Sequence, residues 1–221
     1  MTTEELDDDL RAADGRVPGR RGLATRQRLL EHTQTMLRES SYRELKVVDI
    51  AREAGTSPAT FYQYFPDVES ALLVLAEQAA TDGMFLTEIV TDGPWKGAKG
   101  YATAERLVDE FFDYWSANSS VLRVVDVATA QGDDRFRQIR VRLLNALATA
   151  LAARIGEFTA AGSLPNGVDP MAQAGVVVSM LSHIADHQMG FEFWGIDTRD
   201  VRVSVTRQAF WAITGQKPPA P

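Results

Sequence analysis

The fold is decided by the stretch DIAREAGTSPATFYQYFPDVESAL, residues 49–72, in which a short turn separates two runs of helical character. Apolar residues within 47–54 recur at helical spacing, and Gly55 is the residue type that commonly ends a helix in the left-handed conformation. Ser57 and Pro58 are a good N-cap and a favoured first helical residue. Two helices joined by such a turn make a helix-turn-helix, whose second helix enters the DNA major groove.

The second of these helices is expected to have one packed face and one exposed face. At about 100° per residue, Phe61 and Phe65 fall on the side that packs against the neighbouring helices. The helix is expected to stop before Pro66, because a residue that precedes proline disfavours the helical region. The residues predicted to point outward are Ala59, Thr60 and Gln63, with Tyr62 and Tyr64 on the two flanks.

These outward residue types suit contact with DNA. A Gln63 side chain can make two hydrogen bonds to an adenine edge, and a small Ala59 or Thr60 can lie against a thymine methyl group. The tyrosines are placed to reach phosphates, which set the register of a protein on DNA without reading its sequence. The alternative is an aromatic cluster that serves only as core, which is the expected role of Phe61 and Phe65.

The charge of the chain is unevenly distributed. The net charge is −7, which taken alone argues against a nucleic-acid partner. Residues 16–65, however, carry nine Lys and Arg against five acids, whereas residues 1–15 carry one against six and residues 66–221 carry thirteen against nineteen. The predicted helix-turn-helix is therefore the basic part of an acidic chain, as DNA binding requires.

The sequence VVDIAREAGTSPATFYQYFPDVESAL resembles the DNA-binding domain of the TetR family of transcriptional repressors, and the likeness extends over about residues 23–75. The shared features are an Ile-Ala and Ala-Gly pattern in the second helix and a recognition helix that ends in aromatic residues. The resemblance implies that Thr60, Tyr62 and Tyr64 contact DNA. It also implies core positions for the two phenylalanines.

Two positions depart from the family pattern. Lys46-Val47 stands where Thr or Ser is usual, and Val68 stands where Lys is usual. Because both positions ordinarily touch phosphate, other cations would have to supply those contacts or else remain solvated surface charges; the candidates are Lys46, Arg52, Arg20 and Arg21. The full predicted set of DNA-contacting residues is Lys46, Arg52, Ser57, Ala59, Thr60, Tyr62, Gln63 and Tyr64.

The remaining pattern is helical throughout and predicts an all-α fold. Before the motif, residues 23–40 form a first helix, with Arg26, Arg28 and Arg38 expected to face water or phosphate; after it, Asp67 can cap a fourth helix. A glycine-rich break at 91–101 is followed by helical segments predicted at 101–117, 119–131, 134–161, 169–190 and 199–214. The predicted division is a flexible arm at 1–21, a helix-turn-helix DNA-binding domain at 22–66, a helical ligand-binding and dimerisation domain at 67–214, and a flexible tail at 215–221.

The second domain offers candidate ligand-contacting side chains. Leu107, Phe111, Tyr114 and Trp115 share one stripe that could line an apolar pocket or could be plain core. The other candidates are Met180, His183 and His187. The two histidines have a spacing compatible with metal binding, but no zinc-peptidase motif surrounds them, so the sequence predicts neither a metal nor a cofactor.

The resemblance implies that the larger domain binds a ligand and joins two subunits through the last two long helices, 169–190 and 199–214. The sequence therefore predicts a homodimeric repressor that binds a palindromic double-stranded DNA operator and is released by a small apolar effector. With no apolar run long enough to span a membrane, no export signal and no cysteine, a cytoplasmic protein is expected.

Two other classes of protein stay open on the sequence. A helical hydrolase or metal-dependent enzyme is one, because GTSPA at 55–59 imitates the turn that presents a serine nucleophile. That turn needs a buried strand before it, whereas 47–54 has helical period. The other is a helical binding protein whose DNA module has lost its role, which Val68 and the acidic balance would favour.

Overall fold

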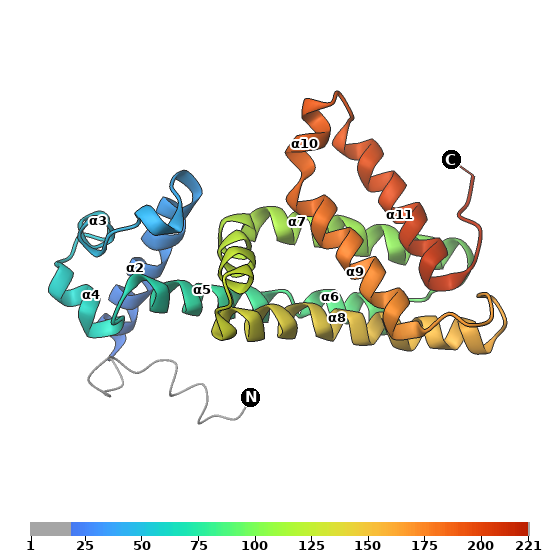
Figure 1. Cartoon of the computed structure of the whole chain (residues 1–221), viewed down its shortest axis with the longest axis horizontal. Helices are drawn as coiled ribbons and strands as arrows, with labels where there is room; N and C mark the ends of the chain where they lie inside the picture. Colours follow the sequence, from blue (N-terminus) through green and yellow to red (C-terminus); the bar gives the residue numbers. More distant parts are fainter. Residues whose placement is uncertain (1–18, 221) are drawn as a thin grey trace. The chain divides into compact units, whose positions relative to one another are not determined.

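The structure is a computed structural model that describes residues 19–220. No strand occurs in this part of the chain, and the predicted all-α class is confirmed. The chain runs through the following elements (Figure 1): α2 (Arg20–Glu39), η1 (Tyr42–Glu44), α3 (Val47–Glu53), α4 (Pro58–Tyr64), α5 (Val68–Asp82), α6 (Phe85–Asp92), α7 (Gly97–Ala130), α8 (Asp134–Ala160), α9 (Pro170–Asp186), α10 (Gln188–Phe193) and α11 (Thr198–Thr214).

The described residues form two compact units. The first contains residues 19–79 and 120–139, and the second contains residues 80–119 and 140–220. The predicted boundary after residue 66 follows the sequence motif, whereas the first unit also takes in most of α5 and the turn that joins α7 to α8. The division into domains drawn from the sequence stays a prediction.

Helix α2 begins earlier than expected and buries an unexpected residue. It starts at Arg20 after Gly19, not at residue 23, so the last two residues of the predicted arm are helical; residues 1–18 of that arm lie outside the described range. Arg26 was expected to face outward but is buried, because it lies three and four residues before Leu29 and Leu30 on the same face. Its long side chain packs its stem into the core.

The helix-turn-helix forms as the sequence predicts. Gly55 has φ +67°, which lets the chain leave α3 in the left-handed conformation. Ser57 caps α4 by accepting a hydrogen bond from the Thr60 amide at 3.2 Å, and Pro58 occupies the first turn. The chain becomes extended at Phe65, immediately before proline.

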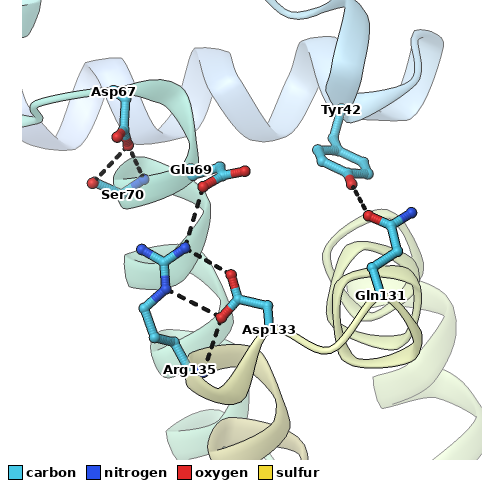
Figure 2. Close-up of polar contacts among 7 residues, drawn as sticks. All are labelled: Tyr42, Asp67, Glu69, Ser70, Gln131, Asp133 and Arg135. Atoms are coloured by element: carbon cyan, nitrogen blue, oxygen red, sulfur yellow. Dashed lines mark hydrogen bonds and ion pairs between the residues drawn. The ribbon is translucent and has the colours of Figure 1, made fainter.

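Helix α5 starts with the predicted cap. The Asp67 carboxylate accepts hydrogen bonds from the amide and the hydroxyl of Ser70, both at 2.7 Å (Figure 2). In the same unit, Arg135 at the start of α8 donates to Glu69 at 3.2 Å and to Asp133 at 2.7 Å. The hydrogen bond from Arg135 holds the pKa of Asp133 below its usual range. This contact ties the first turn of α5 to the α7–α8 turn.

The structure of residues 80–119 differs from the sequence prediction in two ways. Helix α6 was missed in the sequence, although Leu86, Ile89 and Val90 give it a buried face. Helix α7 is continuous where a break at residue 118 was predicted. The Asn118 side chain donates to the Tyr114 carbonyl at 3.0 Å, so this polar residue bonds within its own helix and does not end it.

The C-terminal helices also differ from the predicted segments. The segment expected as one helix over 169–190 divides at His187 into α9 and α10, and α10 joins α9 to α11 (Figure 1). Arg202 of α11 donates to Asp109 and Asp113 of α7, at 3.2 and 2.6 Å. The tail predicted to be flexible is held at Gln216, whose side chain accepts from the Gly97 amide at 2.8 Å.

Across residues 19–220, no helix has the length and the apolar content needed to cross a membrane.

Candidate nucleic-acid interface and effector site

Helix α4 separates a buried face from an exposed one as predicted. Phe61 is 0% exposed and its ring lies 5.4 Å from that of Phe65, which is also buried. Ala59 and Gln63 are exposed on the opposite side. Thr60 is half-buried, and its hydroxyl lies 3.0 Å from Ser57 Oγ. The face therefore presents a small side chain and an amide, held on a helix whose N-cap is satisfied.

The two flanking tyrosines differ in exposure. Tyr62 is 53% exposed, with the edge of its ring against Phe61 at 5.9 Å between centroids, whereas Tyr64 is half-buried. The alternative that Tyr62 serves only as core does not fit this exposure. Its hydroxyl can reach a group outside the protein while the ring remains supported by Phe61.

The cationic side chains predicted to contact phosphate differ in whether they already form ion pairs. Lys46 is exposed at the N-terminus of α3. Arg52 is exposed too, but it is paired with Asp49 at 3.0 Å and contacts Glu53 at 3.5 Å, which compensates its charge. Arg20 and Arg21 occupy the exposed first turn of α2. Lys46 and the two arginines are thus better placed than Arg52 to meet phosphate.

The aromatic stripe of α7 is buried in the second unit. Phe111 and Trp115 stack with centroids 5.5 Å apart and planes at 16°. Leu107 and Tyr114 are also buried. Burial raises the pKa of the Tyr114 hydroxyl, and the negative charge of Asp82 raises it further. The indole N–H of Trp115 is buried and has no hydrogen-bond partner among residues 19–220. A buried donor without an acceptor is unusual in a folded protein.

The other three predicted pocket residues lie elsewhere. Met180 lines a cavity of about 320 Å³ with residues of α9, α10, α11 and the α10–α11 loop, and no α7 residue takes part in it. His183 and His187 are exposed, with ring centroids 4.2 Å apart, and His187 Nδ1 lies 2.8 Å from the His183 carbonyl oxygen. Within residues 19–220, no group of three or more His, Cys, Asp or Glu side chains is arranged to hold a metal ion.

Sequence reasoning missed Phe85, whose ring meets that of Tyr114 at 6.3 Å and extends the aromatic cluster. The signal was present in the apolar period of 85–92, next to the glycine-rich break. Gly83 shows how tightly this cluster is packed, because an added Cβ would lie 2.9 Å from the Tyr114 ring.

The enzyme alternative lacks its structural basis at Ser57. The turn that presents a serine nucleophile follows a strand, whereas helix α3 precedes the turn here and the Ser57 hydroxyl caps α4.

Comparison with proteins of known sequence finds a relative in Haemophilus influenzae. It is described as an uncharacterized HTH-type transcriptional regulator and is 26% identical over 117 residues, which are 53% of this chain and 56% of that protein. The match thus spans about half the length of that curated relative.

Solved structures of similar fold cover most of the chain. The transcriptional regulator FadR from Bacillus subtilis, solved in complex with stearoyl-CoA, has a TM-score of 0.62 at 16% identity, over 86% of this chain and 98% of that one. The SmeT–triclosan complex has a TM-score of 0.64 at 16% identity, over 90% and 99% of the two chains. At such identities these likenesses show the fold.

Family comparison assigns both parts of the chain. Residues 29–70, which hold the helix-turn-helix, match the bacterial regulatory proteins of the tetR family. Residues 86–220 match the tetracyclin repressor-like C-terminal domain, over more than half of the chain. This is a family of regulators and not of enzymes. With an N-terminal helix-turn-helix and a helical C-terminal domain that each match, the chain belongs to the TetR family of transcriptional regulators.

Proposed function

We propose that the protein is a homodimeric repressor that binds a palindromic DNA operator through α4 and is released by a small apolar effector. The observation that carries the proposal is the two-sided build of α4, with Phe61 fully buried and Gln63, Ala59 and Tyr62 exposed. Gln63 would read an adenine edge, and Tyr62, Tyr64 and Lys46 would contact phosphates.

The α7 stripe supports an apolar effector. Stearoyl-CoA and triclosan are bound by FadR and SmeT, which share this fold. In this chain, Phe111 and Trp115 form a buried stacked pair, and a ligand that enters this part of the core would meet their apolar rings and would be oriented by the Trp115 N–H, which lacks a partner within residues 19–220. A mostly apolar ligand that carries an acceptor oxygen satisfies both features.

The C-terminal helices support a dimer. Helix α9 exposes a row of small residues at helical spacing, and an added Cβ at Gly175 would meet nothing within 4 Å. Large apolar side chains are exposed beside it on α9 and α11, among them Val176, Val203 and Trp211. Small residues allow two helices to approach closely, and such an exposed apolar surface marks an interface. We place the partner subunit on α9 and α11, in a four-helix arrangement.

Repression would then depend on the separation of two recognition helices. Half-sites of a palindrome lie about 34–36 Å apart, or a multiple of this, so a shift of several Å between the two helices would prevent both from docking at once. Effector binding would act by favouring such a shifted arrangement. Operator binding would take place in the cytoplasm, which is the localisation expected from the sequence.

A fluorescence-anisotropy titration with DNA from upstream of the protein's own gene tests the proposal. We expect saturable binding that weakens steeply with salt, because phosphate contacts release counterions. Gln63→Glu should abolish it by placing a negative charge against the bases, whereas Gln78→Glu, the same change at an exposed site on α5, should leave it intact. Equal binding by both variants would place Gln63 outside the DNA contact, whereas no binding by the wild type on any upstream fragment would favour a helical binding protein without a DNA role.

A further inference from the structure

A second cavity lies within the first unit, apart from the reading face of α4 and the α7 aromatic stripe. Its volume is about 490 Å³, in the range of small-molecule sites. Residues 37–44, at the end of α2 and in η1, form one wall. Ser120, Arg123, Val124, Val127 and Gln131 of α7 form the other.

Ser120 gives the cavity an unsatisfied polar group. The residue is 9% exposed, and its Oγ has no hydrogen-bond partner in the described part of the chain. A buried Ser or Thr in a helix can satisfy its hydroxyl on the carbonyl four residues earlier, as Thr33 does at 2.7 Å from Leu29. Ser120 does not, so its hydroxyl is available to a ligand polar atom.

The cavity also holds two arginines without partners. Arg38 and Arg123 are exposed, and neither has an ion pair or a side-chain hydrogen bond with any residue in 19–220. Arg43 lies over the Tyr42 ring, 5.8 Å from its centroid. The opposing acids are Glu39 and Glu44.

The acids cancel the charge of these cations only in part. Glu44 is engaged within its own turn, where its Oε2 accepts from the Ser41 amide at 3.2 Å. Three arginines therefore face two glutamates, and the lining keeps a net positive charge although the hydrogen-bonded Glu44 retains its own charge. The balance favours an anion.

We infer that this cavity binds a small organic anion with an apolar body. Its charged group would lie between Arg38 and Arg123, and a polar atom would bond to the Ser120 hydroxyl. Its body would cover Leu37 and Val124, which are buried and form the apolar part of the walls. Arginine suits such a carboxylate because its planar fork can donate two parallel hydrogen bonds.

A ligand here would connect two segments that one hydrogen bond already joins. Tyr42 Oη donates to Gln131 Oε1 at 3.1 Å, and both residues line the cavity (Figure 2). An occupant would fix α2, which packs against the helix-turn-helix, more firmly to the end of α7. The site would thus be a second regulatory input, and its existence does not depend on the proposed effector site at Trp115.

The site can be tested without DNA by isothermal titration calorimetry of the full-length protein with cinnamate. Cinnamate carries a carboxylate on an apolar body. Cinnamamide has nearly the same shape without the charge. We expect saturable cinnamate binding that Arg123→Ala weakens by about tenfold or more, with little change for cinnamamide. Arg106→Ala, an exposed arginine of α7 outside the cavity, should bind cinnamate like the wild type.

A second variant tests whether the ligand occupies the cavity itself. Val127 is partly exposed, so Val127→Trp should be tolerated by the fold and should block both compounds by filling the cavity. No saturable cinnamate binding, or binding unchanged in both Arg123→Ala and Val127→Trp, would overturn the inference. Binding lost only in Trp115→Phe would also overturn it, because the probe would then occupy the proposed effector site, and the proposed function would stand.

Discussion

The guanidinium of Arg26 lies over the ring of Phe65, with Cζ 5.1 Å from the ring centroid, and so joins α2 to the end of the recognition helix. Arg26 is 7% exposed, which is rare for an arginine. A cation held over an aromatic ring is stabilised by the ring quadrupole, the more so when water is excluded. The contact fixes the position of Phe65, and with it the end of α4.

We expect Arg26→Ala to lower the free energy of unfolding by about 1–3 kcal/mol, since it removes this contact and leaves a void beside Phe65. Arg28→Ala is the matched control, because Arg28 is exposed on the same helix and its side chain donates a hydrogen bond to the exposed Thr25. Its effect should stay within about 0.5 kcal/mol. Urea denaturation followed by circular dichroism measures both, and equal losses would show that Arg26 has no special role.

The effector site leads to a second prediction. Trp115→Phe keeps the stack on Phe111 but removes the unpartnered N–H, so a bound effector should lose affinity while operator binding stays unchanged. Trp95→Phe is the control, because the Trp95 N–H already donates to the Val90 carbonyl at 2.9 Å. It should cost stability and spare the ligand. The measurement is release of operator DNA by an effector found by screening apolar compounds, and release unimpaired in Trp115→Phe would refute this role.

The dimer surface can be tested with two exposed valines. Val176 on α9 is 65% exposed and Val141 on α8 is 55% exposed, so either can accept a charge in the isolated subunit. We expect Val176→Glu to yield a monomer, because a glutamate would be buried between two helices without a partner. Val141→Glu should remain dimeric. Sedimentation velocity distinguishes them, and a dimeric Val176→Glu would place the interface elsewhere.

The Arg135 contact predicts a dependence of stability on pH. Because the pKa of Asp133 is lowered by the hydrogen bond from Arg135, its contribution is present above the unfolded-state value of about 3.9 and is lost as pH falls through the folded-state value. Asp133→Asn should therefore lose less stability than the wild type on acidification. Since Arg135 is exposed, the difference should be about 1 kcal/mol or less. If the free energies of unfolding of the two proteins fall in parallel as the pH is lowered, this contribution is excluded.

Local chemistry made the helix-turn-helix predictable. The glycine at 55, the serine cap at 57 and the aromatic spacing of α4 each specify backbone or burial within a few residues, and all were confirmed. The burial of Arg26 was missed because its charge suggests solvent, although its spacing from Leu29 and Leu30 puts it on the buried face of α2, where it lies over Phe65.

Longer-range features could not be read in the same way. The polar residues at 118–120 imitate a helix end, yet α7 continues because Asn118 bonds within the helix. The buried stripe of α7 was visible as a period, but its partner Phe85 and the free Trp115 N–H depend on packing that a period does not report. The predicted DNA and ligand contacts stay predictions until they are measured.

The central claim, that α4 reads DNA, is tested most directly by binding of Gln63→Ala and Tyr62→Phe to a panel of operators that each carry one base-pair change. Gln63→Ala should relax the preference at one or two base pairs, because it removes the amide that reads a base edge. Tyr62→Phe should weaken binding to every operator by a similar factor, because a phosphate contact is blind to base identity. Base-selective loss in Tyr62→Phe, together with uniform loss in Gln63→Ala, would contradict the account.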